Sequence, residues 1–393
     1  MAVRSPTASC GRSCWPRPDG TASPGYGAPA TPPPGRTTSR WRGNWPPAAR
    51  DVHEQTRQER DSMSIEKVAL LGLDRISTSL ALGLKAQPQP PTIVGFDPDR
   101  SRANRARSLG ALDRVTRSPE KACREADLVI AALPLDDLRE VFAAIAPYLS
   151  PGCLVTDLAS LQSPTWEWAQ ASLPSNVSFI GGHIILNPAT AGADAPPDDI
   201  STAHADLLQS ALYCLFPTPG TPERVIDIFS RLASALGAVP FFMDITEHDG
   251  IQAGVSALPD LLIVALLRAT VSGPSAVDMR RFAGEPLLSM TDLAAETLHD
   301  RLTALFLNRE RVILQLEHLV QVLRRMRDLL AVEDRDALEE MFLSALAGRA
   351  RWLEERERGL WMQERRVDLS SVPSSGRQLR QLFFTEPPDY KSR

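Results

Sequence analysis

The sequence predicts an N-terminal α/β domain with a doubly wound parallel sheet, followed by an all-helical second half. Up to about residue 243, short apolar runs alternate with helical segments of 10–18 residues. From Thr246 onward, apolar residues recur every three or four positions. Alternating strands and helices favour a parallel sheet with right-handed crossovers, and the later spacing favours helices with one apolar face.

Five apolar runs are the expected strands. They are short and most end at glycine, proline or aspartate, as buried parallel strands do where the chain turns. In chain order they cover residues 67–71, 92–96, 126–133, 153–156 and 177–180. Ligands of such sheets bind at the carboxyl ends of the strands, where Gly72, Asp97, Leu133 and Ser160 would gather.

Charge and hydropathy exclude two classes of partner. The chain has 393 residues and a formal charge of −5. Its first 50 residues contain seven arginines and one acid, or +6, so the remainder carries −11. An acidic body lacks the basic footprint of a nucleic-acid binder. The longest apolar runs, such as Leu261–Leu267, have seven residues, against about 20 for a bilayer span, so we expect no membrane partner.

The five cysteines, at positions 10, 14, 123, 153 and 214, form an odd and scattered set. Cys10 and Cys14 have no second pair and no nearby histidine, so the spacing of a zinc site is missing. Reduced, structural thiols are the expectation. They fit a cytoplasmic protein, and no metal ligand is predicted.

Composition divides the chain into four parts. Residues 1–62 are rich in proline, glycine, serine and arginine and are predicted to be a disordered extension. A transit peptide is one alternative for them, and Met63 as the true start of the protein is another. We expect a dinucleotide-binding domain over residues 63–243, a helical domain over 244–365 and a loop-like tail over 366–393.

The turn after the first strand resembles the dinucleotide fingerprint G-x-G-x-x-G. It reads Gly72-Leu73-Asp74-Arg75-Ile76-Ser77, so only the first glycine is present. Asp74 puts a negative charge where a pyrophosphate would lie, and Arg75 could offset it. An acid 25 residues after Gly72 favours NAD over NADP. The alternative is an ordinary tight turn. The expected cofactor-binding residues are Gly72, Leu73, Arg75, Ile76, Asp97 and Leu133.

The following motifs resemble, in order and spacing, those of the prephenate/arogenate dehydrogenase family. They are Asp157-Leu158-Ala159-Ser160, Phe179-Ile180-Gly181-Gly182-His183, Ala191-Gly192, Phe216-Pro217-Thr218-Pro219-Gly220-Thr221, Glu247-His248-Asp249, Ser256-Ala257-Leu258-Pro259-Asp260, Asp278-Met279-Arg280-Arg281-Phe282-Ala283 and Leu307-Asn308-Arg309. The resemblance covers about residues 65–350. It implies a Rossmann-like domain joined to a helical dimerisation domain.

The resemblance also implies a reaction, oxidative decarboxylation of prephenate or arogenate in tyrosine biosynthesis. Hydride passes from the hydroxyl-bearing ring carbon to NAD, carbon dioxide departs and the ring becomes aromatic. His183 matches the catalytic histidine that takes the hydroxyl proton, and Ser160 matches the serine that bonds both this histidine and the hydroxyl. Arg281 matches the ring-carboxylate clamp, supported by Asp278, and Ser256 lies in the substrate motif.

The chain departs from the family pattern around the expected site. The departures are Asp74, Ser77, Gln162, Ile184, Asn187, Ala189, Ala257 and Asp260. Asp260 would face an anionic substrate with the wrong charge unless a cation neutralises it. Two other functions therefore stay open: a non-enzymatic dimeric homologue that binds a metabolite, and a dehydrogenase of another small hydroxy acid.

Apolar spacing in the second half predicts two long helices. One would span about 33 residues, from Leu298 to Leu330, with its stripe interrupted only at Arg309. The other would cover residues 336–364. Long helices with one apolar stripe pack against a partner, so we expect a homodimer through this half; an intrachain bundle is the alternative. The active site would lie between the halves, with His183 and Ser160 facing Arg281.

Overall fold

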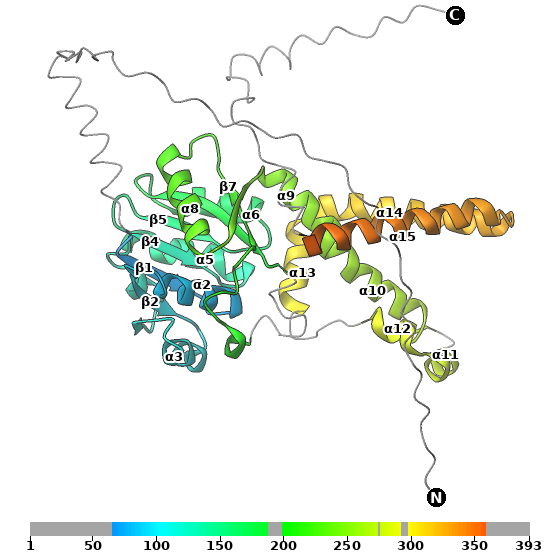
Figure 1. The fold of residues 1–393 in the computed structure, drawn as a ribbon, viewed down its shortest axis with the longest axis horizontal. Coiled ribbons are helices and arrows are strands. Elements are labelled where there is room, and N and C mark those ends of the chain that lie inside the picture. Colours follow the sequence, from blue (N-terminus) through cyan, green and yellow to red (C-terminus); the bar gives the residue numbers. More distant parts are fainter. Residues whose placement is uncertain (1–64, 188–198, 274–275, 292–297, 359–393) are drawn as a thin grey trace, which may run out of the picture. The chain divides into compact units, whose positions relative to one another are not determined.

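A computed structural model describes residues 65–187, 199–273, 276–291 and 298–358 (Figure 1). The predicted N-terminal extension, the alternative start at Met63 and the whole predicted tail over residues 366–393 lie outside these ranges, as do Ala189 and Ala191-Gly192.

The N-terminal half contains a mostly parallel, eight-stranded sheet in the order β3-β2-β1-β4-β5-β6-β7-β8. The strands are β1 (Lys67–Leu71), β2 (Thr92–Phe96), β3 (Arg114–Val115), β4 (Leu128–Ala131), β5 (Leu154–Asp157), β6 (Ser178–Ile185), β7 (Leu212–Phe216) and β8 (Val239–Phe242). All neighbouring pairs are parallel except β6 and β7. The prediction of a doubly wound α/β domain is confirmed.

Helices connect the strands and cover the sheet. They are α2 (Arg75–Lys85), α3 (Arg100–Ser108), α4 (Pro119–Cys123), α5 (Leu135–Ile145), α6 (Ser163–Ser172) and α8 (Glu223–Ala235), with short 3₁₀ turns at Ala146–Tyr148 and Ile200–Thr202. Several begin at a side-chain cap: Asp99, for example, accepts from the amides of Ser101 and Arg102 at the start of α3. Such caps satisfy amides that have no partner inside the helix.

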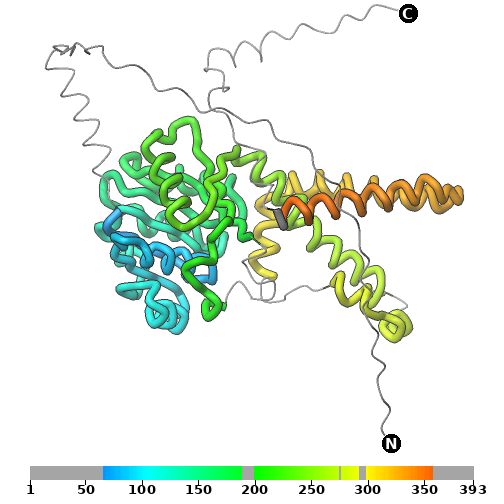
Figure 2. Tube along the Cα trace, in the orientation of Figure 1, coloured from blue at the N-terminus to red at the C-terminus, as the bar shows by residue number. Residues whose placement is uncertain are grey.

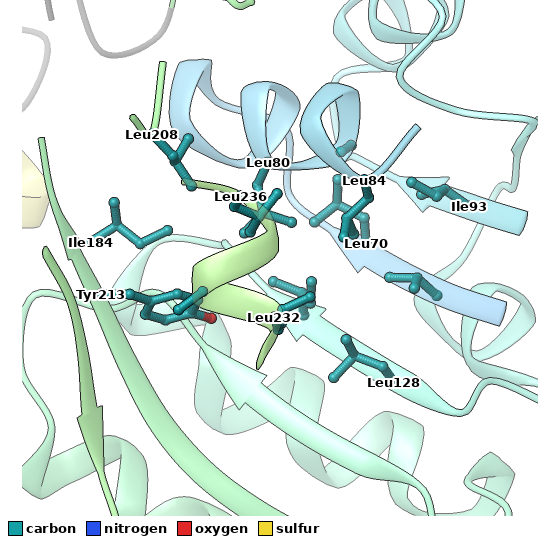
Figure 3. Close-up of a cluster of buried hydrophobic side chains, with 14 of the residues drawn as sticks. Leu70, Leu80, Leu84, Ile93, Leu128, Ile184, Leu208, Tyr213, Leu232 and Leu236 are labelled. Atoms are coloured by element: carbon teal, nitrogen blue, oxygen red, sulfur yellow. The ribbon is translucent and has the colours of Figure 1, made fainter. Parts of the chain in front are cut away.

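The core has two layers because neighbouring strand residues point to opposite faces of the sheet. On β1, Val68 and Leu70 pack into the layer under α2 and α8, while Ala69 and Leu71 pack into the layer under α5. Figure 3 shows the first layer, where side chains from α2 and α8 meet those of the strands. The described cysteines are free and buried, as predicted: Cys123, Cys153 and Cys214.

The sequence prediction missed part of the sheet. β3 has two residues, and β7 and β8 were not expected as strands. The fifth predicted strand, residues 177–180, continues as β6 to Ile185, because antiparallel pairing with β7 extends it. His183 therefore lies within a strand and pairs with Cys214 across the sheet.

The second half is helical throughout its described residues, as the trace in Figure 2 shows. It contains α9 (Ile245–Gln252), a π-helical turn (Ala253–Ala257), α10 (Leu258–Ala269), α11 (Ala276–Phe282), α12 (Glu285–Ser289), α13 (Leu298–Leu307), α14 (Arg309–Ala331) and α15 (Arg335–Arg358). α14 and α15 form a helical hairpin.

The prediction of one 33-residue helix is wrong. The segment forms two helices, α13 and α14, separated at Asn308. Asn308 is buried, and its side-chain amide donates to the backbone carbonyl of Asp249 (2.7 Å). A bond to another element ends α13 although the apolar spacing continues through the break.

The segment Ile245–Ala269 forms one helical run that is long and apolar enough to span a membrane, by length and composition only. Among the described residues it is the single segment of this kind, and 11% of its most apolar window is buried. Length and composition are weak evidence for a span, since an apolar helix that meets another protein surface has the same character.

Candidate active site

Two glycines bring β6 against the loop that follows β5. A Cβ on Gly181 would lie 2.0 Å from Oε1 of Gln162, and a Cβ on Gly182 would lie 2.8 Å from the carbonyl oxygen of Asp157. At Gly182 the clash is with backbone, so glycine is required there; at Gly181 a larger residue would displace the Gln162 side chain. The Gly-Gly pair therefore sets His183 beside the residue 157–163 loop.

The buried side chain of Gln162 connects that loop to β6. Its side-chain amide lies within hydrogen-bond distance of the Asp157 carboxylate (3.2 Å), the carbonyl of Ala159 (3.0 Å) and the carbonyl of Gly182 (3.1 Å). Burial raises the pKa of Asp157 to about 6, although the amides of Gln162 and Gly182 donate to its carboxylate. Gln162, one of the departures from the family pattern, thus gives a buried acid a neutral partner.

His183 and two residues of α9 form a chain of hydrogen bonds. Nδ1 of His183 lies 3.0 Å from Nε2 of His248, and Nδ1 of His248 lies 2.9 Å from Oδ1 of Asp249. His248 is 2% exposed and packs edge-on against the ring of Phe216. Burial, and then the neighbouring His248, lower the pKa of His183 below its ordinary value, so its imidazole is neutral near pH 7.

Asp249 also ties the loop to the helical half. Its carboxylate accepts from the backbone amides of Gln162 (2.9 Å) and Ser163 (2.8 Å). Burial by itself raises the pKa of Asp249, but hydrogen bonds from His248 and these amides outweigh burial and bring it below its ordinary value. The backbone carbonyl of Asp249 accepts from Asn308. Asp249 therefore joins the loop to the α13–α14 break and, through His248, to His183 on β6.

A cavity of about 150 Å³ opens beside this junction, between the loop and the helices. Its lining residues are Ser160, Leu161, Gln252, Ser256, Ala257, Asp260, Asp300, Arg301, Ala304, Leu305 and Asn308. Arg301, on α13, pairs with the carboxylate of Asp260 on α10. The charge of Asp260 is therefore neutralised by a cation, and that cation is Arg301, which the sequence prediction missed.

The structure brings some predicted site residues together and not others. Ser160 and Ser256 line the same cavity. His183 hydrogen-bonds to His248, where a bond to Ser160 was predicted, and it does not line this cavity. Arg281 pairs with Asp278 (3.2 Å), as predicted, but on α11 with its side chain 72% exposed and outside the cavity lining.

The turn predicted to bind a cofactor has the backbone of a nucleotide-binding loop. Gly72 has a φ of +86°, and a Cβ there would lie 2.2 Å from the carbonyl oxygen of Ala132, so glycine is required. The amide of Leu73 donates to Oδ2 of Asp97 (2.8 Å), which is buried at the carboxyl end of β2. Burial raises the pKa of Asp97.

Asp74 occupies the N-terminus of α2. Its carboxylate accepts from the amide of Ser77 (2.6 Å), and the Ser77 hydroxyl accepts from the amide of Asp74 (2.9 Å), which forms a capping box. The departure at Ser77 thus has a structural role. Of the other predicted cofactor residues, Arg75 and Leu133 are buried and Ile76 packs partly against the core.

An α/β sheet with a glycine turn and a buried acid after β2, joined to a helical domain, is the architecture of a two-domain protein with a nucleotide-binding half. The nucleotide-binding domain of prephenate dehydrogenase matches residues 80–241, and the prephenate dehydrogenase dimerization domain matches residues 244–344. The chain belongs to the prephenate dehydrogenase family. The predicted family is confirmed, and its nucleotide-binding domain agrees with the expectation of a nucleotide cofactor.

Known relatives agree with this assignment. The chain is 27% identical over 278 residues to the cyclohexadienyl dehydrogenase of Zymomonas mobilis. The aligned part is 70% of this chain and 92% of the relative. The chain shares its fold with a prephenate dehydrogenase of Aquifex aeolicus in complex with hydroxyphenyl propionate and NAD+ (TM-score 0.61, 21% identity, 74% and 99% coverage). It also shares its fold with the Synechocystis arogenate dehydrogenase (TM-score 0.62, 21% identity, covering 73% of this chain and 99% of that one).

These matches favour a prephenate/arogenate dehydrogenase type of oxidoreductase over the two alternative functions. The residues matched to the nucleotide-binding domain begin at position 80, after the turn at Gly72 and the Asp74 cap.

Replacing Asp74 with glycine is expected to tighten NAD binding by about tenfold, because it frees the helix N-terminus that such folds offer to a pyrophosphate. Tenfold corresponds to about 1.4 kcal/mol, within the repulsion of about 4 kcal/mol for two charges 4 Å apart at an effective dielectric near 20. Isothermal titration calorimetry with NAD measures the change.

Asp244→Gly is the matched control, since Asp244 caps α9 in the same way, through the amides of Thr246 and Glu247. Loss of such a cap to glycine costs only a few tenths of a kcal/mol. Equal NAD affinity in Asp74→Gly and in the unaltered protein would contradict the electrostatic interpretation.

Proposed function

We propose that the protein catalyses NAD-dependent oxidative decarboxylation of a cyclohexadienyl substrate, prephenate or arogenate, in tyrosine biosynthesis. The observation that carries this proposal is a neutral histidine, His183, held at a glycine-rich strand beside the serine loop. A cytoplasmic location is part of the proposal, in keeping with the free thiols of Cys123, Cys153 and Cys214.

In this reaction His183 takes the proton of the substrate hydroxyl. Its lowered pKa suits that role, because a general base must be unprotonated at the working pH. Ser160, which lines the cavity, orients the hydroxyl. Aromatisation of the ring supplies the driving force, so positioning of the reactants provides most of what the protein must contribute.

The residues that would hold NAD are those at the carboxyl ends of β1, β2 and β4. Asp97 would bind the ribose hydroxyls, and Gly72, Leu73, Arg75, Ile76 and Leu133 would form the surrounding turn. When bound, NAD accepts the hydride. The backbone of the turn and the position of Asp97 fit the cofactor, while the Asp74 cap is the one feature that opposes it.

Turnover is tested by absorbance at 340 nm with prephenate and arogenate, each with NAD and NADP. His183→Asn is expected to lower kcat by at least about 10²-fold, the usual contribution of a general base, with little change in KM. Asn at this position removes the imidazole and keeps a polar side chain.

His204→Asn is the matched control, because His204 lies near α2, outside the cavity lining. Absence of turnover with either substrate at millimolar NAD would contradict the proposed function. Because burial lowers the pKa of His183, kcat/KM should also stay level as the pH falls to about 6.5, where an exposed histidine is half protonated.

The charges of the cavity favour arogenate. A carboxylate of the substrate would meet Arg301, and an ammonium group would meet Asp260, so the existing ion pair offers both partners of an amino-acid side chain. Asp300 adds a second negative charge to the lining. The keto side chain of prephenate carries no cation for Asp260. For the ring carboxylate, Arg281 with Asp278 stays the proposed clamp.

Asp260→Asn is expected to lower the ratio of kcat/KM for arogenate over prephenate by about tenfold, because a charge-assisted hydrogen bond to the ammonium group becomes a neutral one. Steady-state kinetics with both substrates measures the ratio. Asp336→Asn, which removes a carboxylate at the start of α15, is the control. An unchanged ratio in Asp260→Asn would show that Asp260 does not select the side chain.

A homodimer through the helical half is also proposed, in keeping with the dimerization domain matched there. Large apolar side chains on α14 and α15 are more than half exposed in the single chain, among them Leu314, Phe342, Leu343 and Leu346. An exposed apolar surface of this extent marks a protein interface.

Light scattering on the eluting protein is expected to give twice the chain mass of 43.0 kDa. The double substitution Leu314→Asp with Leu343→Asp should convert it to a monomer, because it buries two charges in the contact. Leu109→Asp, on the exposed surface of the nucleotide-binding half, is the control. A monomeric unaltered protein would contradict this assembly.

A further inference from the structure

We propose that His248 and Asp249 are positioning residues that hold the His183 ring in one tautomer, with Nε2 as its basic nitrogen. The inference rests on the proposed role of His183 as the base that takes the hydroxyl proton. Neither residue was assigned a role from the sequence.

The direction of each hydrogen bond follows from the chemistry of the carboxylate. Asp249 accepts from two backbone amides, and an ionised carboxylate can only accept. Nδ1 of His248, 2.9 Å from Oδ1 of Asp249, must therefore carry a proton. A neutral His248 then has a lone pair on Nε2, which accepts from Nδ1–H of His183 at 3.0 Å. Nε2 of His183 is left without a proton.

The opposite arrangement would disable the base. If His248 carried protons on both nitrogens, it would donate to Nδ1 of His183, and Nε2 of His183 would hold the proton. The two arrangements differ in which nitrogen of His183 carries the proton, and that nitrogen can be observed by NMR.

The two hydrogen bonds that link His183, His248 and Asp249, together called the relay, stabilise the imidazolium that the proton transfer produces, without moving a second proton. The substrate O–H bond breaks and a bond from hydrogen to Nε2 of His183 forms. The C–H electron pair would pass as hydride to NAD held at the turn after β1, and the bond to the ring carboxylate would break to release carbon dioxide. The electron pair of that bond would make the ring aromatic and leave a phenolate oxygen, which regains the proton from Nε2 of His183. The imidazolium formed in between donates through Nδ1 to His248, whose other nitrogen is held by the Asp249 carboxylate.

The same carboxylate positions the serine loop. By holding the amides of Gln162 and Ser163, Asp249 fixes the segment that begins at Ser160. The base and the residue proposed to orient the hydroxyl thus share one anchor. A change at Asp249 should therefore alter kcat much more than KM.

The tautomer is tested by long-range ¹H–¹⁵N spectra of protein labelled at histidine, of which the chain has six. His183→Asn identifies the His183 signals by their loss. The bare nitrogen of His183 is expected to be Nε2. A bare Nδ1 in the unaltered protein would overturn the proposal whether or not the protein shows turnover.

Three variants test the effect on kcat. In Asp249→Asn the side-chain amide can donate to His248 and reverse both bonds, so kcat should fall by about 10²–10⁴-fold, the loss known for a reversed tautomer in a serine protease triad. In His248→Gln the amide oxygen can still accept from Nδ1 of His183, so kcat should stay within about tenfold. His248→Phe keeps the ring and removes the acceptor, so kcat should fall by about 10²-fold.

Thermal unfolding of each variant identifies any loss of folding. Equal kcat for folded His248→Gln and His248→Phe would overturn the proposal. Failure of the proposed function can be told apart from failure of this inference. A protein with no turnover but with an unprotonated Nε2 on His183 would contradict the proposed reaction and still support the hydrogen-bond relay. The expected spectrum together with rescue by His248→Gln supports both.

Discussion

The Asp249 carboxylate is the interaction on which the rest of the site depends. It is buried, ionised and saturated by donors from three directions: the His248 ring, the amide of Gln162 and the amide of Ser163. A buried charge is tolerated only where such donors replace water. Removing any one of them leaves the charge less compensated, so the strand, the loop and α9 are held in a single arrangement.

This constraint accounts for how the two domains share one site. Gly181 and Gly182 let β6 approach the loop, and Asn308 breaks the α13–α14 helix to reach the Asp249 carbonyl. The cavity lined by Ser160 and Arg301 lies beside that junction. Three departures from the family pattern also have partners within the fold. Gln162 bonds to the loop, Ser77 completes a capping box, and Asp260 pairs with Arg301 in the cavity.

Much of the fold could be predicted from the sequence, because its strands are short apolar runs with clear ends at Gly72, Asp97 and Asp157. The rest depends on contacts between residues far apart in the chain. The motifs around His248 and Asn308 are visible in the sequence, but they do not say which distant residue each side chain contacts. His248 bonds to His183, 65 positions away, and Asn308 bonds to Asp249. The antiparallel pairing of β6 with β7 also has no local signal. The glycines before His183 were a usable signal, whereas Arg301 had no motif around it.

The central claim is that Nε2 of His183 faces the reacting hydroxyl. A crystal structure of the protein with NAD and the aromatic product tests it most directly, through the distance from His183 Nε2 to the phenolic oxygen. The account predicts about 2.6–3.2 Å, the reach of a general base, with Nδ1 still bound to His248. A phenolic oxygen more than about 5 Å from Nε2, with protein side chains packed between them, would contradict it.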